Sequence, residues 1–134
     1  MEISSFADLL RSARAQATPQ RLLFVFAGAE LPQDASAEQR AGFAAGEGGA
    51  LVPLMCVDKT PDELQDFAEL LQESLQLGAD WRIVFAAALG GAGGRAPSSA
   101  DCELPLQRMV EAIRQGTHGA LIPFDRRGLP VQFG

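Results

Sequence analysis

The sequence predicts one α/β domain over residues 1–134, with a mixed sheet of about five strands, three helices and a C-terminal β-hairpin. Segments with helical apolar periodicity alternate along the chain with short, continuous apolar runs. A chain of 134 residues suffices for one domain that buries its own core. Two consecutive strand–helix–strand units predict parallel strand pairs with right-handed crossovers, and the last strand adds an antiparallel partner.

The clearest helix covers residues 61–77. Thr60 supplies an N-cap, Pro61 occupies the first helical position and Glu63 completes a capping box. Gly78 ends the helix, because glycine adopts the left-handed conformation of a C′ residue without strain. The apolar stripe of this helix consists of Leu64, Phe67, Ala68, Leu71 and Leu75.

Two further helices are predicted near the ends of the chain. The first begins at Ser4 or Ser5 and ends before Thr18 and Pro19, because the residue that precedes a proline avoids helical geometry. Its inward-facing residues are Phe6, Leu9, Leu10 and Ala13. The last helix begins among residues 98–101 and stops at Gly116. Its apolar face consists of Leu106, Met109, Val110 and Ile113.

Five segments are predicted to be strands. Residues 22–27 and 83–89 are continuous apolar runs, typical of strands covered on both faces, and belong at the sheet centre. Residues 50–57 contain Pro53, which cannot donate to a ladder and favours an edge or a bulge. Residues 120–124 and 129–133 flank a turn that ends at Gly128 and form the hairpin at the sheet margin.

The long connection between the first two strands ends in a glycine-rich stretch, Gly42–Gly49. We expect a loop folded over the sheet edge, with a helical turn at residues 38–40.

Composition excludes several classes of function. The chain has 17 acidic and 11 basic side chains, a net charge of −6, and acidic proteins bind nucleic acid poorly. Its apolar runs are far shorter than the ~20 residues of a membrane span. Two cysteines outside any CxxC pair and one histidine exclude a disulfide framework and a His-rich metal site. We expect a cytoplasmic protein without cofactor or metal and without a nucleic-acid or membrane partner.

One segment has the composition of a ligand-binding loop. Residues 90–99 follow a predicted strand and precede a helix, where backbone amides often cradle phosphate. Residues 91–96 fit the G-x-G-x-x-A variant of the dinucleotide fingerprint, but Pro97 intervenes before the helix, and a surface loop without ligand is preferred. The candidate ligand-binding residues are Gly91, Gly93, Gly94, Arg95, Ser98, Ser99 and the strand-end Asp58.

No catalytic residue is predicted. Cys56 lies in an apolar strand and is interpreted as a small buried hydrophobe. Cys102 lies near a helix N-terminus, which can lower a thiol pKa. Together with His118 and Asp125 it has the residue types of a nucleophilic triad, but the spacing gives this arrangement no support.

Charge is distributed unevenly along the chain. Residues 61–103 contain eight acidic and two basic side chains, whereas residues 104–134 contain two acidic and four basic ones. The predicted helix 61–77 carries an acidic face edged by leucines, which is either a solvated face or a docking site for a basic partner. The candidate interaction residues are Asp62, Asp66, Glu69, Leu70, Glu73, Leu77, Arg126 and Arg127, the arginines coming from a second subunit.

Several phrases along the chain share a resemblance to known proteins. They are residues 5–10, 21–26, 46–51, 56–59 and 124–131. On these phrases the chain resembles a family of small proteobacterial proteins, some of which are described as ribonucleotide reductase alpha subunits. The resemblance implies no catalytic residues. In element order alone the chain is similar to the N-terminal domain of the SseB family, which implies a role in protein interaction.

Two hypotheses of function follow. The preferred one is a non-enzymatic binding or protein-interaction module that is homodimeric, since three helices leave part of a sheet uncovered. The alternative is a small-molecule or nucleotide-binding protein, enzymes included. It uses the Gly90–Ser99 loop together with the strand-end residues Asp58 and Asp125.

Overall fold

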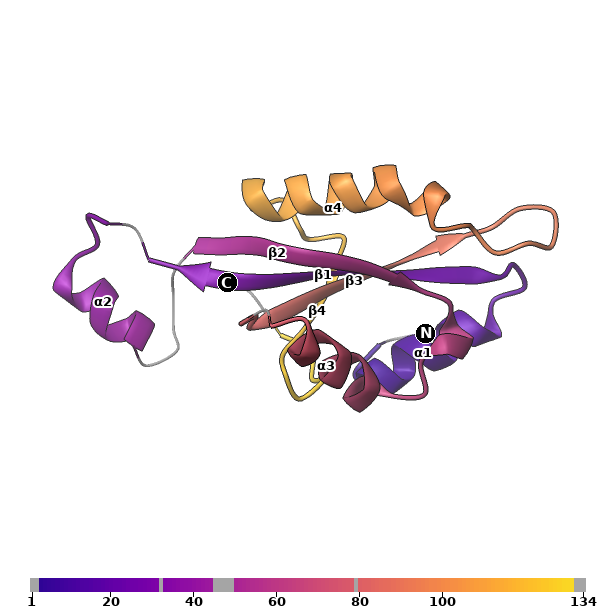
Figure 1. The fold of residues 1–134 in the computed structure, drawn as a ribbon, viewed down its shortest axis with the longest axis horizontal. Helices are drawn as coiled ribbons and strands as arrows, with labels where there is room; N and C mark the ends of the chain where they lie inside the picture. The colour runs from indigo at the N-terminus through magenta and orange to yellow at the C-terminus, as the bar shows by residue number, and fades with distance from the viewer. Residues whose placement is uncertain (1–2, 32, 45–49, 79, 132–134) are drawn as a thin grey trace.

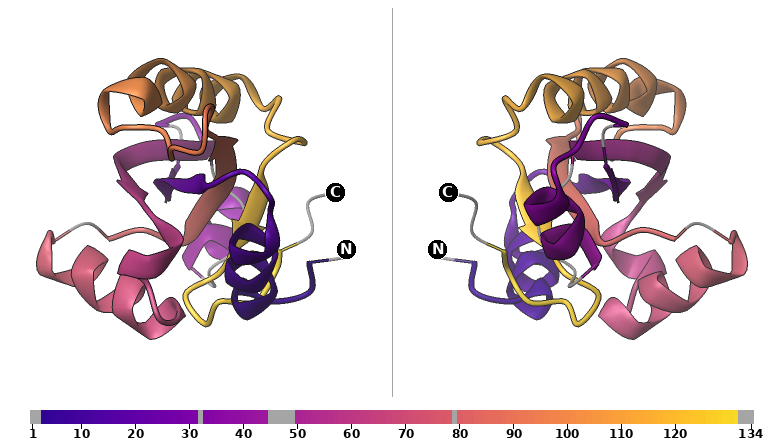
Figure 2. Two further views of the ribbon diagram at one scale, coloured as in Figure 1. Left: turned by 90° about the vertical axis from the view of Figure 1, so that its right-hand side faces the viewer. Right: turned by 90° about the vertical axis from the view of Figure 1, so that its left-hand side faces the viewer.

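The computed structural model describes residues 3–31, 33–44, 50–78 and 80–131. In these ranges the strands form one antiparallel sheet in the order β2-β1-β3-β4. The strands are β1 (Gln20–Glu30), β2 (Ala50–Lys59), β3 (Ile83–Gly90) and β4 (Ile122–Phe124). Helices α1 (Phe6–Ala15) and α3 (Phe67–Gln76) cover one face, and α4 (Glu103–Gln115) covers the other (Figures 1 and 2). The α/β class is confirmed.

The predicted parallel strand pairs are wrong. β1 and β2 pair antiparallel from Leu22↔Lys59 to Glu30↔Ala50, across the connection 31–49. β3 pairs with the opposite side of β1. β2 and β3 therefore run in the same direction but are separated by β1, so the helical crossover between them joins second neighbours and not adjacent strands.

The described residues contain one strand fewer than predicted. After β4 the chain turns through Gly128 at φ +77° and returns to a single bridge, Phe124↔Pro130. One further hydrogen bond, from Val131 N–H to the Pro123 carbonyl at 3.0 Å, continues the return. Proline has no N–H to donate, so the return does not grow into a ladder there. Residues 132 and 133 of the predicted strand lie outside the described residues.

A fourth helix, α2 (Ala37–Ala44), extends the predicted turn at residues 38–40. It is capped by a reciprocal pair in which Gln39 N–H donates to Ser36 Oγ at 3.1 Å and Ser36 N–H donates to Gln39 Oε1 at 2.8 Å. α2 projects beyond the ends of β1 and β2 (Figure 1) and is not folded over the sheet edge as expected. Residues 45–49 of the glycine-rich stretch lie outside the described residues.

Alternate residues of β1 enter two separate cores. The side chains that face α1 and α3 are Leu22, Phe24 and Phe26, and those that face α4 are Leu23, Val25 and Ala27. All six are buried, which confirms the prediction that this apolar run is covered on both faces. β1 and β3 occupy the two central positions of the sheet, as predicted.

The predicted helix 61–77 is divided in two. A 3₁₀ turn, η1 (Pro61–Glu63), carries the capping box, and Leu64 then adopts extended geometry (φ −123°, ψ 126°) with its side chain in the core. Asp66 caps a new helix, α3, by accepting a hydrogen bond from Glu69 N–H at 3.0 Å. This interruption shifts the helical phase, so the stripe predicted from one continuous helix holds only in part: Leu64 is buried and Phe67 and Leu71 pack against the core, whereas Ala68 is exposed. Leu70 and Ser74 are buried, and Leu75 is 49% exposed.

The first helix agrees with prediction, and the last agrees at its end but begins at Glu103, after the predicted range of residues 98–101. Ser5 caps α1, and the residues buried on α1 are Phe6, Leu9, Leu10 and Ala13. α4 ends at Gly116 in the left-handed conformation (φ +75°), after a second 3₁₀ turn, η2 (Ala100–Cys102), has led into it. The residues buried on α4 are Leu106, Met109 and Ile113, with Val110 packed at their margin.

β2 is an edge strand with a bulge, as Pro53 predicts. Met55 pairs with Phe26 and Pro53 pairs with Ala27, so Leu54 is the extra residue. Leu54 lies against Gly28, where a Cβ atom would be 3.1 Å from its Cδ1. A side chain at residue 28 would therefore crowd Leu54 at the bulge.

Candidate functional site

Three side chains from separate segments meet where β1 begins and β2 ends. Asp58 of β2 accepts a hydrogen bond from the Ser99 hydroxyl, with 2.7 Å between Oγ and Oδ1, and forms an ion pair with Arg21 of β1. The Arg21 guanidinium also donates to Ser99 Oγ at 3.2 Å. The antiparallel sheet causes this meeting, because the start of β1 lies beside the end of β2. Two residues of the predicted ligand site, Asp58 and Ser99, are thus in direct contact.

The Arg21–Asp58–Ser99 cluster keeps Asp58 ionised. Burial alone raises the pKa of Asp58, but hydrogen bonds from Ser99 and Arg21 and the charges of Arg21 and Lys59 outweigh it, so the pKa lies below its ordinary value of 3.8. A carboxylate held in this way is a poor general acid and a weak base at neutral pH. Sequence reasoning missed Arg21, although a basic residue that opens an apolar strand was a usable signal.

The glycines of the 90–99 segment build a tight turn. Ala92 and Arg95 form a bridge closed by a hydrogen bond from Arg95 N–H to the Ala92 carbonyl at 3.1 Å. Gly93 and Gly94 between them have φ of +61° and +76°, the signature of a type I′ turn. At Gly91 a Cβ atom would lie 1.7 Å from the Arg95 carbonyl oxygen. Turn geometry and close approach therefore explain all three glycines.

A hollow of about 470 Å³ lies beside this turn. It contains the predicted Gly91, Arg95 and Ser98, whereas Asp58 and Ser99 do not line it. Ser98 is also engaged with the start of η2, since its Oγ accepts a hydrogen bond from Asp101 N–H at 3.2 Å. Arg95 is exposed and contributes the only basic side chain among the described residues that line the hollow.

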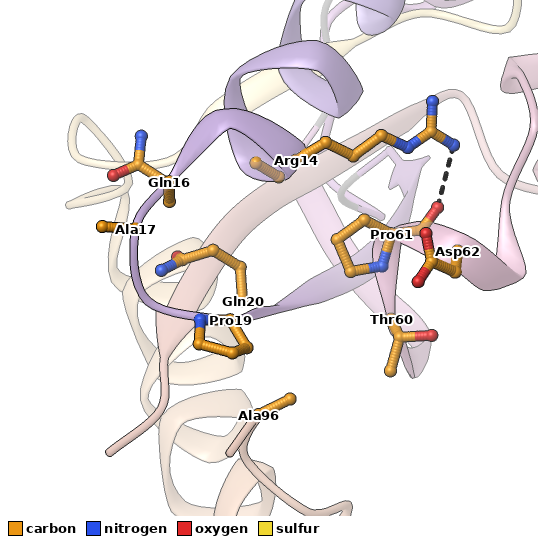
Figure 3. A pocket seen from close by; sticks show the side chains of 10 residues that line it. Arg14, Gln16, Ala17, Pro19, Gln20, Thr60, Pro61, Asp62 and Ala96 are labelled. Carbon is orange, nitrogen blue, oxygen red and sulfur yellow. Dashed lines mark hydrogen bonds between the residues drawn. The ribbon is translucent and has the colours of Figure 1, made fainter. Parts of the chain in front are cut away.

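A second hollow, of about 510 Å³, opens between the end of α1 and η1 (Figure 3). Arg14 crosses it and donates through Nη2 to the carbonyl oxygens of Pro61 at 3.0 Å and Leu64 at 2.6 Å. Gln20 and Asp62 also line this hollow. The Arg14 guanidinium is therefore engaged in holding α1 to the segment before α3. Sequence analysis did not identify this hollow, because its lining comes from three separate segments.

The two cysteines are placed opposite to expectation. Cys56 is exposed, because β2 is an edge strand and the face of β2 that carries Cys56 is only partly covered. Cys102 is fully buried, and this burial, followed by the negative charge of Asp58, raises the pKa of its thiol. The neutral thiol is unsuited to nucleophilic attack. The ring of His118 packs on Phe85 at 4.9 Å, and Asp125 accepts hydrogen bonds from its own turn, so nothing here supports a triad.

The acidic residues of the predicted interaction surface are largely used within the fold. Asp66 caps α3, Glu69 accepts a hydrogen bond from Gln65 N–H at 2.8 Å, and Glu73 pairs with Lys59 at 2.8 Å. Leu70 is buried at 1% exposure, so its assignment to the surface is wrong; the phase shift after Leu64 turned it inward. Asp62 and Leu77 are exposed.

The predicted basic residues also have internal contacts. Arg126 donates through Nε to the Trp81 carbonyl at 2.7 Å and through Nη2 to Asp80 at 3.1 Å, with its guanidinium 5.4 Å from the Trp81 ring centroid. Arg127 pairs with Asp125 at 3.4 Å. Arg126 therefore joins the C-terminal turn to the segment that precedes β3, and Arg127 makes its ion pair within the turn.

A further surface, not anticipated from the sequence, lies where β2 meets α4. Within the described residues β2 pairs with β1 alone, and its other edge is open. A hollow of about 510 Å³ lies beside this edge. Its lining residues are Cys56, Glu103, Leu106, Gln107, Val110, Glu111 and Arg114. We use the name β2–α4 edge for the open edge of β2 together with this adjoining hollow.

Across the described residues, no group of three or more His, Cys, Asp or Glu side chains is arranged to hold a metal ion. None of the described helices has the length and apolar character needed to span a membrane. Comparisons of the chain with protein-family models, with curated proteins and with solved structures find no match.

Proposed function

We propose that this protein is a non-enzymatic interaction module that acts as a homodimer. The observation that carries the proposal is the open edge of β2, a strand of ten residues with a neighbour on one side only in the described structure. An open edge presents unpaired backbone N–H and C=O groups that can pair with another chain. The opposite margin of the sheet differs, because the return after β4 covers part of it.

The state of the candidate chemical groups supports a role without catalysis. Asp58 is held as a carboxylate by Arg21 and Ser99, and Cys102 is a buried thiol with a raised pKa. Neither group is poised to exchange a proton or attack a substrate at neutral pH. The similarity in element order to the SseB N-terminal domain favours the same role.

Sedimentation velocity over a protein concentration range of roughly 1 to 100 μM tests the proposal. We expect the sedimentation coefficient to rise with concentration from the monomer value to that of a dimer. A single monomeric species at every concentration contradicts homodimerisation.

A second candidate function is the binding of a small anionic ligand. It is favoured by one observation, the hollow of about 470 Å³ that Arg95 and Ser98 line beside the glycine turn. Isothermal titration calorimetry with nucleotides and sugar phosphates tests this candidate, and Arg95→Ala should abolish any heat of binding. Equal heat from wild type and Arg95→Ala, or no heat from wild type, rules it out.

A further inference from the structure

One side of α4 carries a self-complementary pattern of side chains. The residues of this side that line the β2–α4 edge are Glu103, Gln107, Val110 and Arg114. Their spacing of four, three and four residues places them on one stripe of the helix. The stripe begins with a negative charge and ends with a positive one, and Glu103 and Arg114 are both exposed, without an ion pair to any described residue.

We propose that a second copy of this chain occupies the β2–α4 edge, related to the first by a two-fold axis that passes close to Cys56. In this arrangement β2 pairs antiparallel with β2 of the partner subunit, and the two α4 helices lie antiparallel across the axis. The inference rests on the proposed homodimer and specifies its interface.

Antiparallel helices bring the two ends of the stripe together. Glu103 then faces the partner subunit's Arg114, Arg114 faces the partner subunit's Glu103, and Gln107 faces the partner subunit's Val110. Each contact occurs twice, as a two-fold interface requires. Along the helix, Glu103 and Arg114 are about 16 Å apart, so the two ion pairs lie at opposite ends of the interface.

The layer geometry supports the same arrangement. α4 packs across both β1 and β2, so its axis lies about one strand spacing, or 4.8 Å, from a two-fold axis at the open edge of β2. The two copies of α4 then lie about 10 Å apart, which is the ordinary distance between packed helices. An added strand pair therefore brings the helices into contact without moving either layer.

The bulge in β2 restricts where the strands can pair. Pro53 has no N–H to donate, and the extra residue Leu54 breaks the regular spacing of the edge. Both features leave the part of β2 from Met55 to Lys59 as its longest regular stretch for pairing. The midpoint of that part is Val57, adjacent to Cys56, and Cys56 also lines the hollow together with the α4 stripe. The strand and the helix thus indicate one position for the axis.

Charge reversal on α4 tests the proposal. Arg114→Glu places like charges opposite each other at both ends of the interface. It should therefore weaken the dimer and raise its dissociation constant by about tenfold or more. The double variant Glu103→Arg/Arg114→Glu restores opposite charges and should recover the wild-type constant to within a few-fold. Arg108→Glu is the matched control, because Arg108 is exposed on the same helix but does not line the hollow.

Sedimentation equilibrium gives the dissociation constants, and thermal unfolding checks that each variant is folded. A wild-type dimer that Arg114→Glu leaves unchanged overturns this interface while leaving homodimerisation intact. So does a double variant as weak as Arg114→Glu alone. A wild-type protein that remains monomeric overturns the homodimer and the interface together.

Cross-linking at Cys56 provides an independent readout. A short bis-maleimide should join two chains through Cys56, because cross-strand neighbours near the axis lie about 5 to 8 Å apart. Cys102 is buried and should not react, so the Cys56→Ser variant is the control and should give no cross-linked dimer. Absence of the cross-link in protein that sediments as a dimer places the axis elsewhere and refutes the proposal.

Discussion

At the scale of single residues, backbone geometry and hydrogen-bond satisfaction account for several residues that sequence reasoning assigned to other roles. Gly91, Gly93 and Gly94 serve a tight turn, although their spacing matches a phosphate-binding pattern. Gly128 was correctly predicted as a turn residue, and its space is restricted as well. A Cβ atom there would lie 2.9 Å from Cγ of Phe67. Positive φ is readable from a glycine between strands, whereas a close neighbour from another element is not.

Gly128→Ala should destabilise the protein by about 1 to 3 kcal/mol, because alanine is strained at φ +77° and would press on Phe67. Urea unfolding followed by circular dichroism measures the change. Gly119→Ala is the matched control, since a Cβ atom at Gly119 has no neighbour within 4 Å, and it should change stability by less than about 0.5 kcal/mol. Equal effects of the two substitutions would refute this role of Gly128.

The hydrogen bond from Trp81 Nε1 to Ser74 Oγ, at 2.8 Å, joins two buried side chains. Ser74→Ala leaves the indole N–H without its partner in the core and should cost about 1 to 3 kcal/mol in the free energy of unfolding. Ser12→Ala, in α1, removes a hydroxyl that makes no hydrogen bond to the described residues and should be close to neutral. A neutral Ser74→Ala would mean that the indole finds another acceptor.

At the scale of secondary-structure elements, local sequence signals predicted where elements begin and end. They did not predict which of two neighbouring N-cap residues starts a helix. The capping box at Thr60 is present, yet it starts only a 3₁₀ turn, because Leu64 is drawn into the core and Asp66 caps the helix that follows. Asp66 is itself a good N-cap residue and was available in the sequence. Which of two adjacent caps starts the helix depended on where the core accepts an apolar side chain.

Asp66→Ala should reduce the free energy of unfolding by about 1 kcal/mol, because it removes the acceptor of Glu69 N–H at the start of α3. Asp62→Ala is the control: Asp62 is also acidic and exposed, and its side chain makes no hydrogen bond to the described residues. Chemical denaturation of both variants measures the difference. Equal losses would indicate a general charge effect and not a cap.

At the scale of the whole molecule, the Arg21–Asp58–Ser99 cluster ties β1 and β2 to the segment that leads into α4. Its side chains are more than 35 residues apart in the sequence. Asp58 and Ser99 were both candidates for one ligand site in a parallel sheet, and they meet in an antiparallel one, whereas Asp58 does not line the hollow that contains Arg95. The reason is that the last residues of β2 and β3 both lie beside the first residues of β1, at the same end of the sheet.

Acid should weaken this cluster. The pKa of Asp58 is lower in the folded protein than its ordinary value of 3.8, so the stabilisation is complete above that value and is lost as pH falls through the folded pKa. Asp58→Asn should therefore be about 1 to 3 kcal/mol less stable than wild type at pH 7, with a gap that narrows below about pH 4. Asp34→Asn, at an exposed position, is the control. A stability difference between Asp58→Asn and wild type that does not change with pH contradicts the lowered pKa of Asp58 in the folded protein.

The sequence by itself determined the α/β class, the two central strands, the edge position of β2 and most helix ends, because these follow from apolar periodicity, prolines and caps that act within a few residues. Only the tertiary structure decided the strand order, the break at Leu64 and the burial of Leu70 and Cys102. These depend on which faces of distant segments meet, and an apolar run has the same pattern whether its neighbour is parallel or antiparallel. The placement of α4 beside the open edge of β2 was likewise decided only by the tertiary structure.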